Sequence, residues 1–265
     1  MPLTVDLPRA QRNAVAELIV AALHDRAAHA ALAALARVLD TTGPLVLDAE
    51  IAARLREHRF VADAHERDAP SPAIAPSLAI APSSHMEVVL APAFARVRAA
   101  AAARVAAACV AADAYWRHAR VADEHETTAS REYRRDAGRN DRRGAPDPDG
   151  QDGLAAALRR AIALFGAGLY FEVHEELEAV WRRADGAARI ALQGLIQIVV
   201  ALHHAERGNV AGARRLLAAG RAKVEPYAPR WEGVALDVLL ADLRRWEHAR
   251  LDEERVAAPP RLVLA

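Results

Sequence analysis

The sequence predicts an all-α protein whose C-terminal half is a compact antiparallel helical bundle. Between residues 153 and 252, apolar residues recur every three or four positions, which is the period of an amphipathic helix. Short links that contain glycine separate these runs, and short links make successive helices antiparallel. The N-terminal half is rich in alanine, which favours helix, and a Pro-rich stretch interrupts it. Because large apolar residues are few there, we expect that half to be mobile.

The bulk composition excludes several classes of protein. The 265 residues include 35 basic and 35 acidic side chains, so the chain lacks the basic excess of a nucleic-acid or membrane-surface binder. The single cysteine, Cys109, excludes an intramolecular disulfide framework. No signal peptide is visible, and arginines interrupt the apolar stretch at residues 91–112. We therefore expect a soluble cytoplasmic protein that binds neither nucleic acid nor membrane.

The N-terminal half divides into four parts. Residues 1–68 are a helical region, in which residues 8–39 form one helix and Asp48 caps a second helix that runs to about residue 68. Residues 69–92 contain five prolines and four serines, which predicts an extended linker. A long Ala/Arg-rich helix follows over residues 93–137. The Gly, Pro and Asp residues of 138–152 predict a second linker and the clearest domain boundary.

Seven of the eleven histidines lie in this half of the chain. A metal site needs several ligands that converge on one ion, and the only regular spacings here are two pairs seven residues apart. Solvated histidines on helix faces are therefore the expectation. The seven are His24, His29, His58, His65, His85, His118 and His125.

The C-terminal half, residues 153–252, predicts five helices before a tail at residues 253–265. They are expected at Leu154–Ala167, Tyr170–Arg183, Ala188–Arg207, Val210–Val224 and Gly233–Asp252. Gly208 suits the end of the third helix and Asn209 can cap the fourth. The residue before Pro226 leaves the helical region, which ends the fourth helix.

Two of these helices, which meet across Asp185-Gly186, carry polar residues where core helices are usually apolar. With the turn at Gly186, Glu178 lies level with Gln193 and Gly194, and Gly194 would let the two helices approach closely. The inner face then holds His174 and the carboxylates of Glu175 and Glu178. Outside it fall Glu172, Glu176 and Arg183. Glu172 stays among the candidates for the pocket or polar network, which are Tyr170, Glu172, His174, Glu175, Glu178, Trp181, Gln193, Gln197, His203 and His204.

Two interpretations of this buried seam stay open. In the first, it is a structural hydrogen-bond network that fixes the helix register of an interaction or oligomerisation module. In the second, it is a site for a small molecule or a divalent metal ion, with hydrolase-type acid/base activity. His174 and Glu178 are four residues apart and can reach one ion from a helix face, but the second histidine of the zincin pattern is missing. Whether the protein is an enzyme is left open, and a homo-oligomer is expected.

Three runs in this half resemble a family known as domain of unknown function 309. They are F-x-x-G-x-Y-F-E-x-H-E-x-L-E-x-x-W from Phe165 to Trp181, L-Q-G-L-I-Q from Leu192 to Gln197, and H-H-x-x-x-G-N-x-x-G-A from His203 to Ala213. The resemblance covers about residues 154–250. It implies a compact all-helical domain and brings no established activity or cofactor.

Overall fold

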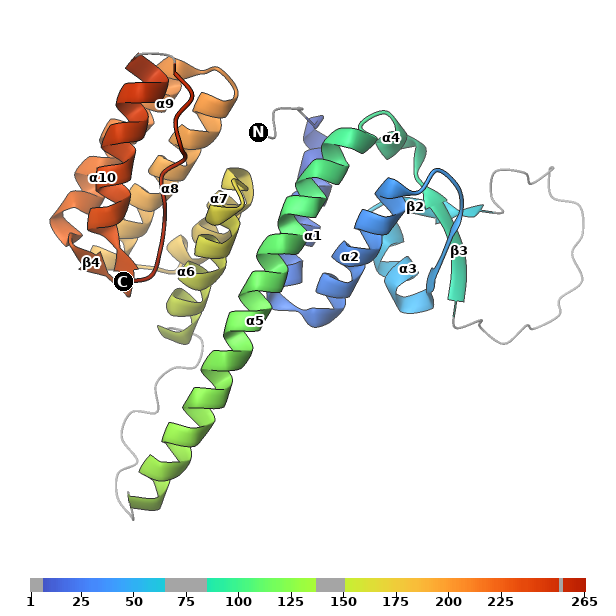
Figure 1. The fold of residues 1–265 in the computed structure, drawn as a ribbon, viewed down its shortest axis with the longest axis horizontal. Coiled ribbons are helices and arrows are strands. Elements are labelled where there is room, and N and C mark those ends of the chain that lie inside the picture. Colours follow the sequence, from blue (N-terminus) through green and yellow to red (C-terminus); the bar gives the residue numbers. More distant parts are fainter. Residues whose placement is uncertain (1–6, 65–84, 137–150, 253–254) are drawn as a thin grey trace, which may run out of the picture. The chain divides into compact units, whose positions relative to one another are not determined.

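The computed structural model describes residues 7–64, 85–136, 151–252 and 255–265 of the chain. These residues form two compact units, one up to Cys109 and one from Val110 onward (Figure 1). Helices dominate, which confirms the predicted all-α class, although two small sheets are present as well. The division falls inside a long helix, whereas the sequence predicted a boundary at residues 138–152, most of which lie outside the described residues.

The first unit begins with two helices, α1 (Arg9–His24) and α2 (Arg26–Asp40). The predicted single helix over residues 8–39 is therefore wrong at Asp25. This residue is extended, with φ −142° and ψ 129°, and its carboxylate accepts hydrogen bonds from the backbone N–H groups of Ala27 and Ala28. The helix restarts there because aspartate is a strong N-cap and a poor residue for a helix interior.

Helix α3 (Ala49–Glu57) begins after Asp48, whose side chain caps it as predicted. It ends at Glu57 and not near residue 68, because the chain turns at Arg59, where φ is 59°. That turn brings Phe60, which is fully buried, into the core of the first unit. The Phe60 ring packs against Phe94 with 4.9 Å between ring centres.

The three-stranded sheet of the first unit has the order β1–β3–β2, with both pairs antiparallel (Figure 1). Its strands are β1 (Leu45–Asp48), β2 (Val61–Asp63) and β3 (His85–Leu90). The predicted linker over residues 69–92 is thus wrong at its end, where β3 is the central strand. The strand forms because the run from Val88 to Leu90 is buried and rich in β-branched residues. Residues 69–84 lie outside the described part of the chain.

The predicted helix over residues 93–137 is two helices, the short α4 (Pro92–Ala95) and the long α5 (Arg98–Asp136). Pro92 occupies the first turn of α4, where its missing N–H costs no hydrogen bond. The core of the first unit draws on α1, α2 and α3. Its largest fully buried side chains are Leu18, Ile19, Leu23, Leu32, Leu35, Leu39, Leu55 and Phe60.

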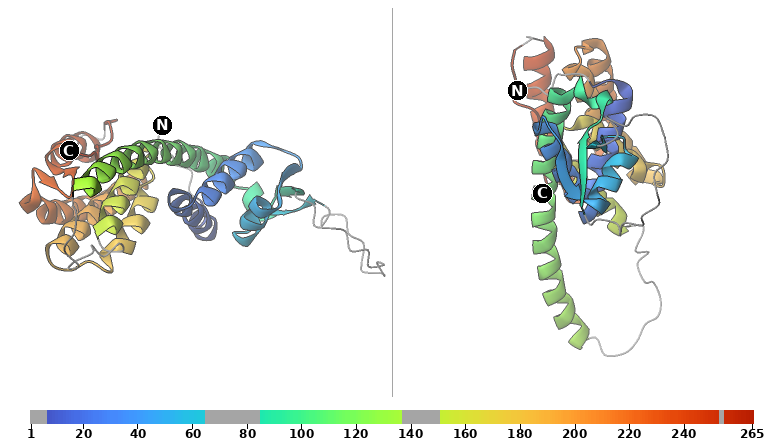
Figure 2. Two further views of the ribbon diagram at one scale, coloured as in Figure 1. Left: turned by 90° about the horizontal axis from the view of Figure 1, so that it is seen from below. Right: turned by 90° about the vertical axis from the view of Figure 1, so that its right-hand side faces the viewer.

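The second unit contains the predicted helical bundle, seen from two further directions in Figure 2. Helix α6 (Gln151–Gly166) packs on α7 (Tyr170–Trp181), α7 on α8 (Gly186–Glu206), and α8 on α9 (Val210–Val224). The bounds of α9 are those predicted, and Asn209 caps it by accepting a hydrogen bond from Gly212 N–H. These helices place the candidate residues, since α7 and α8 carry all of them.

Helices α8 and α9 approach each other closely at two glycines. A Cβ atom on Gly194 would lie 2.9 Å from the carbonyl oxygen of Gly220, and one on Gly220 would lie 2.7 Å from that of Gly194. Glycine is required on both helices because no side chain fits there. The expectation that Gly194 would bring α8 close to α7 is therefore wrong, since this glycine faces α9.

The chain after α9 is more varied than the predicted helix over residues 233–252. A single 3₁₀ turn (Glu225–Tyr227) leads to a small hairpin of β4 (Arg230–Trp231) and β5 (Val234–Ala235), then to α10 (Leu236–Glu247) and a π-helical turn (His248–Asp252). Glu232 and Gly233 have φ of 48° and 76° at the tip of the hairpin. Two residues of positive φ form the tight turn that this pairing requires.

The tail, residues 255–265, packs back onto this hairpin. Val234 and Leu264 form an antiparallel bridge, and Ala235 N–H donates to the carbonyl of Val263. Arg261 donates through its backbone and guanidinium to the carboxylate of Asp242, which is nearly buried. The hydrogen bond from the Arg261 side chain lowers the pKa of Asp242. The described part of the predicted tail, residues 255–265, therefore packs within the second unit.

Helix α8 has the length and mean hydropathy of a membrane-spanning helix, with 44% of its most apolar window buried. It lies between α7 and α9, and its buried side chains include Leu192, Leu195 and Ile198. A core helix of a bundle has the same length and hydropathy as a membrane span.

Candidate functional site

Helix α7 buries a face different from the one the sequence predicted. Val173 and Leu177 are fully buried, and so are the carboxylates of Glu172 and Glu176, which were expected outside. His174 and Glu178 are only half-buried, and Glu175 is exposed. The prediction failed because it placed His174, Glu175 and Glu178 on the inner face, whereas the buried side follows Val173 and Glu176 at helical spacing.

A buried ion pair explains how α7 tolerates the carboxylate of Glu176 on its inner face. Nε of Arg160, on α6, donates to Oε1 of Glu176 at 2.7 Å, with both side chains almost fully buried. A buried carboxylate without such a partner would lose several kcal/mol of solvation. This ion pair joins α6 to α7, and neither of its residues was among the candidates predicted for the α7–α8 seam.

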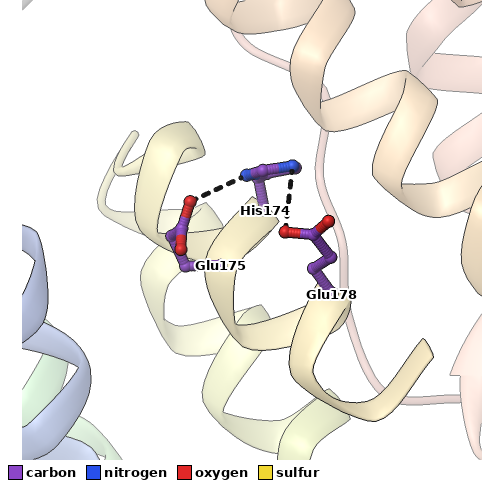
Figure 3. A group of neighbouring side chains, drawn as sticks. All are labelled: His174, Glu175 and Glu178. Carbon is purple, nitrogen blue, oxygen red and sulfur yellow. Dashed lines mark hydrogen bonds and ion pairs between the residues drawn. The ribbon is translucent and has the colours of Figure 1, made fainter. Parts of the chain in front are cut away.

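The residues His174, Glu175 and Glu178 form a cluster on the partly exposed side of α7 (Figure 3). One side-chain ligand atom from each lies within 4.8 Å of the others, and this is the one such group among the described residues. Nδ1 of His174 lies 3.2 Å from Oε1 of Glu175, and Nε2 lies 3.8 Å from Oε2 of Glu178. The imidazole therefore stands between two carboxylates, with one ring nitrogen toward each.

Arg182 adds a positive charge to this cluster. It lies one helical turn beyond Glu178, and its guanidinium nitrogen is 3.0 Å from Oε2 of Glu178. That oxygen is the one that also faces Nε2 of His174. The Arg182 side chain is 65% exposed, so it is held by this contact and little else.

Of the two glutamines of α8 that were predicted to line the pocket, Gln197 has a contact with α9. Nζ of Lys223, on α9, donates to Oε1 of Gln197 at 3.2 Å, so Gln197 is directed to α9. Gln193 is half-buried on α8. The prediction that Gln197 lines a pocket together with His174 and Glu178 is therefore wrong, because Gln197 contacts α9.

The end of α8 contributes a second polar group beside α7. Nδ1 of His203 lies 3.9 Å from Oε2 of Glu206, and the Phe171 ring lies between His203 and His174, 6.1 and 6.3 Å from them. Tyr170 is buried, and burial, together with the nearby charge of Glu206, raises the pKa of its hydroxyl.

His204 and Trp181 have local structural contacts. The side-chain amide of Asn209 donates to Nδ1 of His204, which ties the end of α8 to the cap of α9. The guanidinium of Arg189 lies 4.1 Å from the centre of the Trp181 ring and donates to the Trp181 carbonyl oxygen. Both contacts secure the links between helices, and neither joins the histidine-carboxylate cluster.

The histidines of the N-terminal half that are described do not form a ligand group. Nδ1 of His58 lies 3.6 Å from Oε2 of Glu17, and the His58 ring is tilted against Phe60. His85 is exposed on β3. The side chains of His65, His118 and His125 lie outside the described residues.

Comparison with known proteins identifies the helices that carry this cluster. A family model described as a domain of unknown function, DUF309, matches residues 158–216, from α6 into α9. The chain therefore resembles DUF309 proteins over residues 158–216. The DUF309 match contains the whole cluster, Arg160 and Gly194.

A relative of this domain is the uncharacterised protein YpuF of Bacillus subtilis. It is 48% identical over 50 residues, a stretch that covers 18% of this chain and 29% of YpuF. The similarity thus extends over less than a third of that relative. No solved structure matches the chain.

Three residues with ion pairs in or beside α7 were not among the predicted candidates: Arg160, Glu176 and Arg182. A signal existed for Glu176, because it lies beside Leu177 on the stripe that starts at Val173. Arg182 follows Glu178 at the i, i+4 spacing of a helical ion pair. Arg160 could not be found this way, because its partner belongs to another helix.

Proposed function

We propose that the DUF309 domain binds a divalent transition-metal ion through Nε2 of His174 and the carboxylate of Glu178, with Glu175 orienting the imidazole. The observation that supports this proposal is the position of the ring between two carboxylates, with Nδ1 3.2 Å from Glu175 and Nε2 3.8 Å from Glu178. Histidine and carboxylate are the ligand types that zinc and its neighbours accept.

The contact with Glu175 would select the tautomer that a metal ion needs. A neutral imidazole carries one proton, and a carboxylate next to Nδ1 favours the tautomer with the proton on that nitrogen. Nε2 then presents its lone pair on the side of Glu178. A carboxylate that holds the far nitrogen of a ligating histidine is a common feature of zinc sites.

The separation of the two ligand atoms is close to what one ion requires. Metal–ligand bonds of about 2.0–2.2 Å place neighbouring ligand atoms roughly 3–3.5 Å apart. The 3.8 Å between Nε2 of His174 and Oε2 of Glu178 therefore calls for a small side-chain rotation. Both side chains are partly exposed on one face of α7, so they are free to make that movement.

Two protein ligands from one helix leave coordination positions open. Water or a substrate could fill them, which is the arrangement that hydrolytic metal sites use. A second copy of the chain could also supply ligands, and this keeps the homo-oligomer expected from the sequence within the proposal. The buried-network interpretation does not account for His174, Glu175 and Glu178, because these side chains are partly exposed.

The test is a Co²⁺ titration of the purified, metal-free chain, followed by visible absorption and calorimetry, together with elemental analysis of the protein as isolated. We expect one bound ion per chain. His174→Ala and Glu178→Gln should abolish binding, and Glu175→Gln should weaken it roughly ten- to a hundredfold, since it removes only the orienting carboxylate.

The matched control is Glu225→Gln, which removes an exposed carboxylate outside the cluster. Its affinity for Co²⁺ should equal that of the wild type. The proposal would be contradicted if the wild-type protein bound no Co²⁺, or if Glu178→Gln bound Co²⁺ with the same affinity as the control.

A further inference from the structure

Arg182 occupies the position that a metal ion would compete for. Its guanidinium nitrogen lies 3.0 Å from Oε2 of Glu178, and the same oxygen faces Nε2 of His174. A cation bound between those two atoms would lie within a few ångströms of the guanidinium charge. Two cations that close repel each other, and the carboxylate oxygen cannot serve both at full strength.

We propose that Arg182 is the resident counter-ion of the His174–Glu178 site, and that a divalent metal ion binds there by displacing its guanidinium from Glu178. This inference rests on the proposed metal site. It assigns a role to the residue that follows α7, which binds no metal itself and yet sets the affinity of the site for the ion.

The charges favour an exchange of this kind for a dication. With a neutral imidazole, the cluster has two negative charges, on Glu175 and Glu178, and Arg182 offsets one of them. A divalent ion that replaces Arg182 neutralises both carboxylates and gains an imidazole ligand. A monovalent ion in the place of Arg182 would remove the Arg182–Glu178 ion pair with no gain in charge, so the exchange selects divalent ions.

Moving the Arg182 guanidinium away from Glu178 costs little free energy. The Arg182 side chain is 65% exposed, so its guanidinium regains water when it leaves Glu178. Exposed ion pairs of this spacing on a helix contribute little to stability. The structure of α7 therefore does not depend on the contact, and the carboxylate stays in place for the ion.

The neighbouring Arg183 provides a matched comparison. It is exposed at the same end of α7 and carries the same charge, but it makes no contact with the cluster among the ion pairs of the described residues. Removing the charge of Arg183 measures the general effect of net charge on cation binding. Removing that of Arg182 measures this effect plus the competition for Glu178.

The experiment is a Co²⁺ titration by calorimetry of four full-length proteins: wild type, Arg182→Gln, Arg182→Lys and Arg183→Gln. Arg182→Gln should bind Co²⁺ roughly three- to tenfold more tightly than wild type, as expected for the loss of one like charge at about 5 Å in water-exposed surroundings. Arg182→Lys keeps the charge and should stay within about twofold of wild type, as should Arg183→Gln. All four should have the same thermal unfolding without metal, because both arginines are exposed.

The outcomes separate this inference from the proposal on which it rests. If wild type binds Co²⁺ and Arg182→Gln binds it no more tightly, the displacement is overturned and the metal site stands. Equal tightening by Arg182→Gln and Arg183→Gln also overturns it, because net charge alone then explains the effect. If none of the four proteins binds Co²⁺, both the metal site and the displacement of Arg182 are contradicted.

Discussion

At the scale of single residues, the pair of Arg160 and Glu176 fixes how α6 and α7 meet. Both side chains are almost fully buried, and the donor and acceptor atoms are 2.7 Å apart. Two charges removed from water need good geometry with each other to offset the lost solvation. The pair therefore holds the Glu176 face of α7 against α6, and this leaves His174, Glu175 and Glu178 on the partly exposed side of the helix.

Breaking this pair should destabilise the second unit strongly. Glu176→Gln leaves the guanidinium of Arg160 buried without its counter-charge, and we expect a loss of about 3–5 kcal/mol in the free energy of unfolding. Chemical denaturation of the wild type and the variant measures it. The double variant Arg160→Met with Glu176→Leu removes both charges and should recover most of that loss. A single variant as stable as wild type would contradict the role given to this pair.

At the scale of elements, sequence patterns located most helices of the second unit but not their contacts. Helix α9 was predicted to the residue because Asn209 and Pro226 mark its ends with local chemistry. The predicted inner face of α7 was wrong in part because Glu176 is buried beside Arg160 of α6, and helical spacing within α7 does not reveal a partner in another helix. The same holds for Gly194, which serves α9 and not α7.

The missed strands have a related cause. Strand β3 lies next to a Pro-rich stretch whose composition predicts a linker, and its pairing with β1 and β2 depends on segments distant in sequence. The β4–β5 hairpin has strands of two residues each, too short for an alternating pattern. Its one local signal was the turn at Glu232-Gly233.

The contact between α8 and α9 gives a prediction at this scale. Gly220→Ala would place a Cβ atom 2.7 Å from the carbonyl oxygen of Gly194, so the helices must move apart. We expect a net loss of about 1–3 kcal/mol, even though alanine favours helix more than glycine does. Thermal or chemical unfolding measures this loss.

Gly166→Ala is the matched control for that substitution. Gly166 ends α6, and a Cβ atom there would meet no other atom within 4 Å. Its stability should be unchanged or raised by up to about 1 kcal/mol. If both variants behave alike, the close approach of α8 and α9 does not limit this position.

At the scale of the whole molecule, the chain has two hydrophobic cores, one on each side of Cys109. The first is built from α1, α2, α3 and a three-stranded sheet, and the second from α6 to α10. The DUF309 match lies entirely in the second unit, and so does the histidine-carboxylate cluster. A unit with its own core is expected to unfold cooperatively.

Two core substitutions test this division. Leu35, on α2, and Leu217, on α9, are both fully buried, and Leu→Ala at such positions costs about 2–5 kcal/mol. In scanning calorimetry of the full chain, we expect two unfolding transitions. Leu35→Ala should lower the temperature of one and Leu217→Ala that of the other, while the second transition stays in place each time. Added Co²⁺ should raise only the transition that Leu217→Ala lowers, because a ligand stabilises the unit that binds it. A single transition that both variants lower would mean that the two cores unfold together, and the metal site would then stabilise the whole chain.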